Sequence, residues 1–351
     1  MIDVDKSTKN VIMYVYIERV IFRRRYMKSV FLFPGQGAQK KGMLKDVCDK
    51  YPEAMAVVKA AEEISGEKIS DFMWNCEESE LARSDRSQLA ITTSSLALLK
   101  VLESKGYEPE ICAGFSLGEF AALCAAGVLT FEETITLVKQ RGIIMQKACD
   151  KLAQASGGED AKPGMAAVIG LTPEQVIEAV KPLAEKGIAF AANMNSPKQT
   201  VISGTFQGLK EAEALCTAAG CRRYIKLKVA GPFHSPLMQE AGVEFEKVLA
   251  TMNFKDPVKR LFSNVTGKEI TKGEEAKQLA VKHFTNPVLW TSEEKEIAQI
   301  IDSANADCKN NWSIFEVGPG TVLSGLWRDS TYAENISCAA VNSAESLDAI
   351  N

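Results

Sequence analysis

The sequence predicts an α/β protein built on a mainly parallel sheet, with a smaller domain inserted in the middle of the chain. Strand and helix patterns alternate on both sides of residues 164–229, and such alternation is typical of a parallel sheet covered by helices. Within residues 164–229 the expected order is strand, helix, strand, strand, helix, strand, which is the order of a ferredoxin-like unit. We therefore expect a large core of residues 28–150 and 230–335 that carries a ferredoxin-like subdomain of residues 164–229.

Length and composition are those of an ordinary folded protein. The 351 residues can bury a large core, and the formal net charge of −4 gives no general attraction to nucleic acid or an anionic membrane. No apolar run reaches the roughly 20 residues that span a bilayer. The nine cysteines are scattered without a C-x-x-C pair, so we expect neither a disulfide framework nor a metal site, and a reducing cytoplasm is the expected setting.

The ends of the chain and one internal stretch are expected to lie outside the folded units. Residues 1–27 place an apolar run before Arg23-Arg24-Arg25, which is the reverse of a signal peptide. We interpret them as an N-terminal extension or an over-called start, with a peripheral anchor as the alternative. Residues 151–163 are polar and glycine-rich and predict a connector, and residues 336–351 are expected to form a C-terminal tail.

The first strand leads into a glycine-rich loop. Val30–Phe33 is apolar, and Pro34 breaks it before Gly35-Gln36-Gly37. The loop lacks the third glycine of a dinucleotide-binding motif and the Gly-Lys-Ser/Thr ending of a P-loop, so a nucleotide site is not expected. Its backbone N–H groups can nevertheless approach a ligand closely. Helical spacing follows over residues 51–64 and 88–104.

The clearest chemical signal lies in Ile111–Glu119. The stretch predicts a buried strand, a tight turn with Ser116 at its apex and a closely packed helix, and its G-x-S-x-G pattern is that of a nucleophile elbow. A serine hydroxyl needs a positioned base to become a good nucleophile, and the chain has only two histidines. We favour His234, which lies between two prolines where the chain re-enters the core, over His283 near a helix end.

Two further features complete the expected site. An oxyanion needs backbone donors, and the N–H groups of Leu117 and Gln36 are the natural candidates. Thr130 and Glu133 match a capping box that begins a helix ending near residue 149, and Arg141 lies on its apolar face. A buried arginine is costly unless it is paired, so Arg141 either reaches solvent or binds an anionic partner.

The second half of the chain supplies the remaining elements. In the inserted unit we expect strands over 165–170, 188–194, 200–203 and 224–229, with helices over 173–186 and 206–219. After the chain returns to the core we expect helices over 237–252, 274–284 and 292–301, and strands over 260–263 and 314–317.

Several short motifs, in this order and spacing, resemble those of malonyl-CoA:acyl carrier protein transacylases. They are residues 33–39, 114–119, 140–142, 231–238, 286–290 and 316–320. The resemblance extends from about Met27 to Arg328 and implies an α/β-hydrolase-like core with a ferredoxin-like subdomain. It also implies that Ser116 is the nucleophile and His234 its base, with the N–H groups of Gln36 and Leu117 as the oxyanion hole.

The resemblance implies roles for the substrate pocket as well. Arg141 would bind the free carboxylate of malonyl, because a guanidinium matches a carboxylate bidentately. Gln88 falls where the family keeps a pocket glutamine, and Phe233 resembles the malonyl-preferring pattern. Phe115 stands where many members have histidine, and we expect it to change pocket polarity. His283 stands about where a residue, often glutamine, orients the catalytic histidine, and a backbone carbonyl could do this whatever the side chain.

The expected activity is a two-step transfer of malonyl from malonyl-CoA to Ser116 and then to the phosphopantetheine thiol of acyl carrier protein, supplying fatty acid synthesis. No metal or bound cofactor is implied, and the enzyme is expected to be a monomer. Acyl carrier proteins are acidic, so a basic patch is a candidate docking site, although a solvated strand face would explain it equally: Arg222, Arg223, Lys226 and Lys228. The alternatives are a stand-alone polyketide-type acyltransferase, a serine esterase or thioesterase, and a non-catalytic carrier-protein binding module.

Overall fold

A computed structural model describes residues 28–157, 161–304, 312–330 and 336–350. The expected N-terminal extension and residues 158–160 of the expected connector lie outside these ranges. None of the helices within them is both long and apolar enough to cross a membrane.

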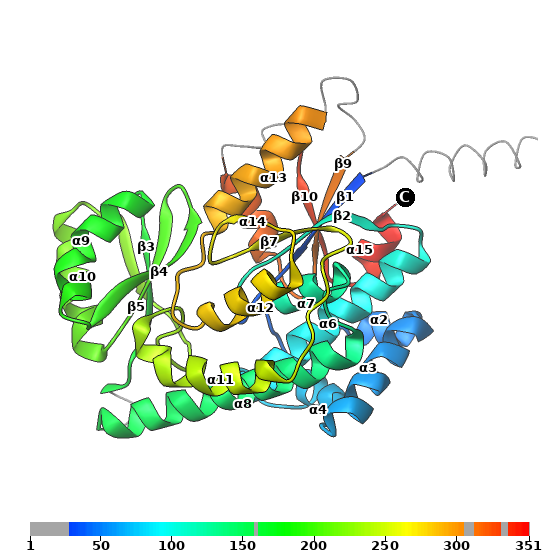
Figure 1. Ribbon diagram of the computed structural model, residues 1–351, viewed down its shortest axis with the longest axis horizontal. Helices are drawn as coiled ribbons and strands as arrows, with labels where there is room; N and C mark the ends of the chain where they lie inside the picture. The colour runs from blue at the N-terminus through cyan, green and yellow to red at the C-terminus, as the bar shows by residue number, and fades with distance from the viewer. Residues whose placement is uncertain (1–27, 158–160, 305–311, 331–335, 351) are drawn as a thin grey trace, which may run out of the picture.

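The larger of two sheets has six strands in the order β10-β9-β1-β2-β7-β8 (Figure 1). All neighbouring strands run parallel except the antiparallel pair β7 and β8, so the expectation of a mainly parallel sheet is confirmed. The strands are β1 Lys28–Phe33, β2 Pro109–Gly114, β7 Arg260–Ser263, β8 Lys268–Ile270, β9 Trp312–Val317 and β10 Cys338–Val341.

Apolar side chains cover both faces of this sheet, as expected of buried parallel strands. In β1, Phe31 and Phe33 belong to one core cluster, whereas Val30 and Leu32 belong to the cluster on the opposite face. The helices that surround the sheet are α2 Lys45–Lys50, α3 Pro52–Ser65, α4 Ile69–Trp74, α5 Glu78–Leu81, α6 Ser84–Ser104, α7 Gly118–Ala125, α8 Phe131–Ala155, α11 Gln239–Ala250, α12 Gly273–Lys282, α13 Trp290–Ala304, α14 Val322–Asp329 and α15 Ala344–Ala349.

Helix α8 begins as its sequence predicts and ends later. The Thr130 hydroxyl accepts from the N–H of Glu133, and the Glu133 carboxylate accepts from the N–H of Thr130, so the capping box is confirmed. The helix continues to Ala155, into the stretch expected to be a connector. It runs from the large sheet towards the small one (Figure 1).

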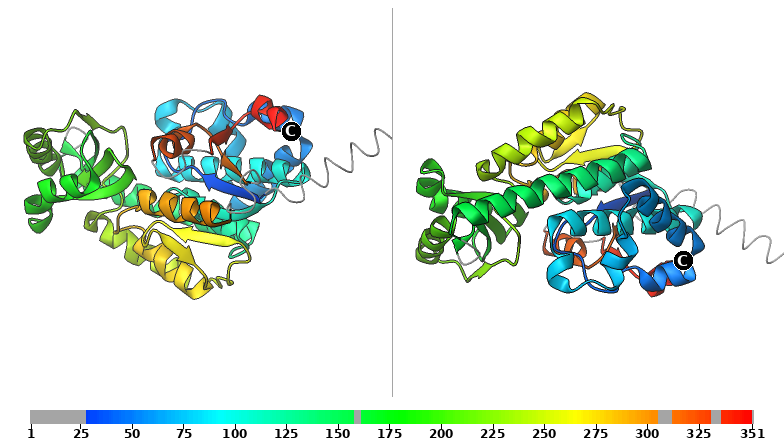
Figure 2. Two further views of the ribbon diagram at one scale, coloured as in Figure 1. Left: turned by 90° about the horizontal axis from the view of Figure 1, so that it is seen from above. Right: turned by 90° about the horizontal axis from the view of Figure 1, so that it is seen from below.

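The smaller sheet is antiparallel and has the strand order β4-β5-β3-β6. With its two helices it has a core cluster of its own, and it lies to one side of the large sheet in both views of Figure 2. Its elements are β3 Gly164–Ile169, α9 Pro173–Glu185, β4 Ala189–Ser196, β5 Gln199–Gly204, α10 Phe206–Ala218 and β6 Arg223–Lys226.

Main-chain contacts join the small sheet to a segment of the large unit. Asn193 of β4 forms an isolated parallel bridge with Val288. The N–H of Met194 donates to the Val288 carbonyl over 2.9 Å, and the N–H of Val288 donates to the Ala192 carbonyl over 2.8 Å. The segment just before α13 is therefore tied to the edge strand of the small sheet.

Residues 336–351, expected to form a tail, contain two regular elements of the large unit. Strand β10 pairs with β9 at the edge of the sheet. Helix α15 lies beside α2, where the Tyr51 hydroxyl donates to Asp348 over 2.6 Å and the N–H of Ala344 donates to Asp46 over 2.7 Å.

Candidate active site

Ser116 lies at the turn between β2 and α7, in a backbone conformation that a serine rarely adopts. Its φ is +51°, in the left-handed region, as a nucleophile elbow requires. The flanking glycines allow the turn to pack against backbone: a Cβ at Gly118 would lie 1.9 Å from the Phe33 carbonyl oxygen. The N–H of Phe115 also donates to that oxygen over 2.9 Å. The elbow is thus held against the end of β1.

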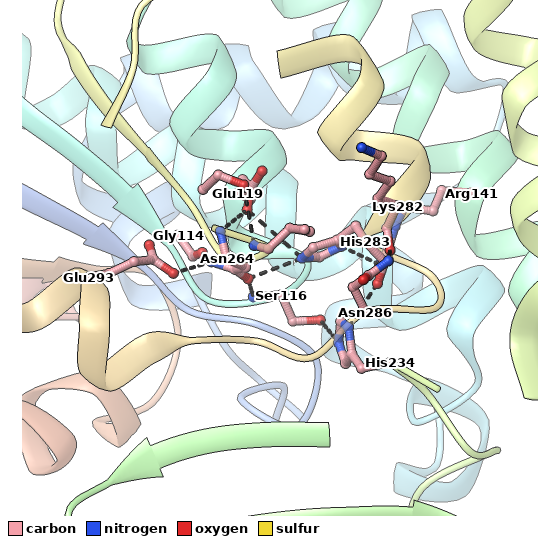
Figure 3. A network of polar contacts seen from close by, with 12 residues as sticks. Gly114, Ser116, Glu119, Arg141, His234, Asn264, Lys282, His283, Asn286 and Glu293 are labelled. Carbon is pink, nitrogen blue, oxygen red and sulfur yellow. Dashed lines mark hydrogen bonds and ion pairs between the residues drawn. The ribbon is translucent and has the colours of Figure 1, made fainter. Parts of the chain in front are cut away.

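His234 is the partner of Ser116 (Figure 3). Its Nε2 lies 2.8 Å from the serine Oγ, and its Nδ1 lies 2.9 Å from the backbone carbonyl oxygen of His283. A carbonyl can only accept, so Nδ1 must carry the proton and Nε2 must present its lone pair to the serine hydroxyl. This is the tautomer that a general base needs.

The surroundings of His234 keep the imidazole neutral. Burial and, after it, the positive charge of Arg141 lower the pKa of His234 to about 4. The residue also has a left-handed φ of +57°, in a loop where the Ser235 hydroxyl donates to the Pro232 carbonyl over 2.6 Å. At neutral pH His234 can therefore accept a proton from Ser116.

The glycine-rich loop of Gln36 lies against the elbow. A Cβ at Gly35 would be 2.4 Å from the carbonyl oxygen of Phe115, so the two backbones are in direct contact. The Gln36 side chain points elsewhere, donating to the Ser84 hydroxyl over 3.3 Å. Within the described ranges, the backbone N–H groups of Gln36 and Leu117 donate to no other residue. In the part of the chain that the structure describes, neither predicted oxyanion donor is thus engaged in another hydrogen bond.

Arg141 does not reach solvent, because its exposed fraction is only 1%. Its Nη1 donates to Gln88 Oε1 over 2.8 Å, and its Nη2 lies 3.4 Å from His283 Nδ1. The guanidinium carbon is 5.1 Å from the ring centre of Phe120 and 5.2 Å from that of Phe284. The structure therefore places Arg141, Gln88 and His283 in one buried cluster.

The charge of Arg141 is not neutralised by a direct contact. Among the described residues it forms no ion pair, and its Nε has no hydrogen-bond partner. Burial lowers its pKa to about 9, so the guanidinium is still charged at neutral pH. The carboxyl that interacts with it, Glu119, has a pKa that burial raises to about 8. A buried cation of this kind favours the binding of an anion.

Phe115 and Phe233, the two phenylalanines singled out from the sequence, have different surroundings. Phe233 is 6% exposed and belongs to the main core cluster, and its carbonyl oxygen accepts from the hydroxyl of Ser203 in β5. Phe115 packs edge-on against Trp290, with 5.5 Å between the ring centres. Phe233 thus connects the His234 loop to the small sheet, whereas Phe115 packs on the large unit.

Sequence reasoning missed Asn264, which lies directly after β7. Its Oδ1 accepts from the N–H of Ser116 over 2.6 Å and lies 3.0 Å from His283 Nε2. The carboxyl ends of parallel strands meet at one edge of a sheet, so a polar residue after a strand was the available signal. That signal could not be used, because nothing local in the sequence states that β7 neighbours β2.

Comparison with known families adds to this geometry. Residues 30–309 match the family described as the acyl transferase domain. The chain belongs to this acyltransferase family.

Individual relatives of this acyltransferase carry more specific names. It is 35% identical to the malonyl CoA-acyl carrier protein transacylase of Bacillus subtilis over 300 residues, covering 85% of this chain and 89% of the relative. The crystal structure of an acyl carrier protein S-malonyltransferase from Vibrio cholerae has a TM-score of 0.80 and 32% identity, covering 92% of this chain and all of that one. A malonyl-transacylase in complex with its type II polyketide synthase acyl carrier protein has a TM-score of 0.81 and 33% identity, covering 92% and 98%.

Proposed function

We propose that this acyltransferase moves malonyl from malonyl-CoA to the phosphopantetheine thiol of acyl carrier protein, for fatty acid synthesis. The observation that carries the proposal is the Ser116–His234 pair beside the buried cation Arg141, which has no ion-pair partner among the described residues. The names of relatives at 32–35% identity support the same substrate.

In the first step Ser116 Oγ attacks the thioester carbonyl of malonyl-CoA while His234 Nε2 takes the hydroxyl proton. The N–H groups of Gln36 and Leu117 stabilise the oxyanion of the tetrahedral intermediate. When the C–S bond breaks, His234 returns the proton to the departing coenzyme A thiolate. In the second step the phosphopantetheine thiol attacks the malonyl-serine ester, with the proton passing through His234 in the same way, and Ser116 is restored.

The remaining site residues bind the malonyl group or orient the residues that act on it. Arg141 holds the free carboxylate of malonyl, and Gln88 holds the guanidinium through Nη1. Phe233 supplies apolar surface beside the acyl group. His283 orients His234 through its backbone carbonyl. The transfer uses no bound metal or cofactor, since every proton and electron pair is handled by these groups and the two thiols.

We also propose the class of each structural unit. The order β4-β5-β3-β6 with two helices supports a ferredoxin-like subdomain, and the serine between β2 and α7 supports an α/β-hydrolase-like core.

The acidic carrier protein would meet a basic patch whose members are exposed: Arg222, Arg223, Lys226 and Lys228. The eight described cysteines are unpaired, which supports a reducing, cytoplasmic setting. We expect the enzyme to act as a monomer.

Mass spectrometry of the intact protein tests the proposal. After mixing with malonyl-CoA we expect one malonyl group on Ser116 and one equivalent of free coenzyme A, with no label on Ser116→Ala. Adding phosphopantetheinylated acyl carrier protein should move the malonyl group to the carrier. Rapid release of free malonate without carrier protein would indicate a hydrolase instead, and a serine that never acylates would indicate a binding module.

A further inference from the structure

Asn264 uses every hydrogen-bonding position of its side chain. Its Nδ2 donates to the Gly114 carbonyl over 2.7 Å and to Glu293 Oε1 over 2.8 Å. Its Oδ1 accepts from the N–H of Ser116 over 2.6 Å and from His283 over 3.0 Å. An amide has two N–H donors and two acceptor lone pairs, so none is left over. The two acceptors and two donors around it also fix which end of the amide is oxygen.

The backbone of Asn264 is held as firmly as its side chain. Its N–H donates to Glu119 Oε2 over 2.8 Å, and its carbonyl accepts from the N–H of Leu289 over 2.8 Å. The residue is fully buried. These contacts come from α7, from the segment before α13 and from α13 itself through Glu293 (Figure 3). A side chain anchored from so many elements can impose its geometry on a neighbour.

The neighbour that needs such help is Ser116. A non-glycine residue in the left-handed region is strained, and the strain persists only where surrounding contacts over-determine it. The amide of Asn264 bonds the chain on both sides of the apex, at the Gly114 carbonyl and at the Ser116 N–H. It therefore acts as a bracket across the elbow.

The same amide connects the nucleophile to the rest of the site. Arg141 can only donate, so His283 Nδ1 must accept from it and His283 Nε2 must donate to Asn264 Oδ1. The carbonyl of His283 accepts from His234. One chain of hydrogen bonds thus runs from the serine backbone through Asn264 and His283 to both the base and the cation.

We propose that Asn264 is a positioning residue, which fixes Ser116 Oγ in line with His234 by bracketing the elbow and bonding His283. The proposal depends on the proposed function only for the choice of malonyl-CoA as substrate. A misplacement of a reacting atom by about 1 Å can cost about 100-fold in rate. We therefore expect removal of the Asn264 side chain to lower the rate of acylation and to change substrate binding little.

Single-turnover acylation of Ser116 tests this inference. In Asn264→Ala we expect the rate constant at saturating malonyl-CoA to fall about 100-fold, while KM changes less than about threefold and the malonyl-to-acetyl ratio is unchanged. The fraction of protein that finally acylates should match that of the wild type. The control is Ser263→Ala, which removes a buried hydroxyl next in the chain that bonds only the N–H of Val265 among the described residues, and it should keep the wild-type rate.

A second variant separates positioning from folding. The pair Asn264→Asp with Glu293→Gln keeps the acceptor for Ser116 and His283, supplies a donor opposite the new carboxylate and leaves the formal charge unchanged. It loses the donor to the Gly114 carbonyl, so it keeps one side of the bracket. It should acylate at least tenfold faster than Asn264→Ala. A lower melting temperature or a smaller reactive fraction in Asn264→Ala, with a wild-type rate constant, would overturn the proposal. Failure of both variants to fold would also overturn it, by assigning the side chain to the fold alone.

A probe without a carboxylate keeps this test independent of the proposed function. Phenylmethanesulfonyl fluoride reacts with activated serines through the same hydroxyl. If the wild type takes no malonyl but reacts with this probe, the proposed substrate is wrong while the Asn264→Ala comparison can still be made. The inference itself fails if Asn264→Ala reacts with the probe as fast as the wild type.

Discussion

The two sheets of this acyltransferase are assembled from the chain in different ways. The small sheet uses one stretch, residues 164–226, in which each strand pairs with strands close to it in sequence. The large sheet joins strands from Lys28 to Val341. Ser116, Arg141 and Asn264 all belong to the large unit, while the small sheet reaches the site through contacts to the chain at Phe233 and Val288. The large unit, assembled from segments distant in sequence, therefore supplies the catalytic residues. The small sheet, assembled from one stretch of chain, contacts segments next to them.

Removal of Arg141 should produce the largest effect, because it is a buried charge of the large unit. Loss of one partner of a buried ion pair costs about 3–5 kcal/mol, so we expect Arg141→Ala to lower malonyl transfer by about 200- to 5,000-fold. Acetyl transfer should fall less than tenfold, because acetyl has no carboxylate. Steady-state rates with malonyl-CoA and acetyl-CoA measure the ratio.

Two variants sharpen that result. Arg141→Lys should recover little malonyl transfer, since a lysine cannot form the same fork. Lys147→Ala removes an exposed charge from the same helix α8 and should change neither activity. Equal losses of malonyl and acetyl transfer in Arg141→Ala would show that Arg141 does not bind the malonyl carboxylate.

The two units should also differ in their tolerance of added atoms. A Cβ at Gly118 would meet backbone at 1.9 Å, whereas one at Gly164 of β3 would find its nearest neighbour, a flexible Leu209 methyl group, at 3.9 Å. We expect Gly118→Ala to lower the free energy of unfolding by about 3 kcal/mol or more, and Gly164→Ala by less than about 1 kcal/mol. Urea titration of both variants measures the difference. Similar losses would mean that the elbow can relax.

The pH dependence tests the neutral state of His234. Its pKa of about 4 lies below the usual value, so the base is neutral above that pH and is lost as the pH falls through it. With phenylmethanesulfonyl fluoride, the rate should be level from about pH 7 to 5 and then fall tenfold per unit below about 4. A midpoint near 6.5 would mean that the imidazole is better solvated than its burial indicates.

The smallest effect is expected where the small sheet meets the site. Ser203→Ala removes the hydroxyl that donates to the Phe233 carbonyl, at a cost of about 1 kcal/mol. We expect malonyl and acetyl transfer to fall together by about fivefold, because Arg141 is not involved. The control is Thr217→Ala, which removes an exposed hydroxyl that donates to a backbone carbonyl within α10. A changed malonyl-to-acetyl ratio would show that the small sheet shapes the acyl pocket directly.

The features that could be predicted from the sequence are those that depend on nearby residues in the chain. Local patterns predicted the capping box at Thr130, the course of α9 and α10, and the turn at Ser116, because each depends on neighbours in the chain. They did not predict that residues 336–351 add β10 and α15, since an edge strand of four residues carries little periodicity.

The residues of the site likewise fall into those that the sequence could identify and those that it could not. Ser116, His234 and Arg141 could be proposed from residue type and motif, and the structure brings them into one cluster. Asn264 could not, because its importance depends on β7 lying next to β2. The tautomers of His234 and His283 were also out of reach, since they are set by a carbonyl and a guanidinium distant in sequence.

The positive charge of Arg141 has a consequence for the timing of catalysis. In the empty site that charge helps to keep the pKa of His234 low and so weakens it as a base. A malonyl carboxylate bound to Arg141 would cancel the effect and raise the pKa, so the substrate itself would strengthen the base that acts on it. Acylation by malonyl-CoA should then titrate at a higher pH than acylation by acetyl-CoA, and an empty site would keep its serine less reactive towards stray electrophiles.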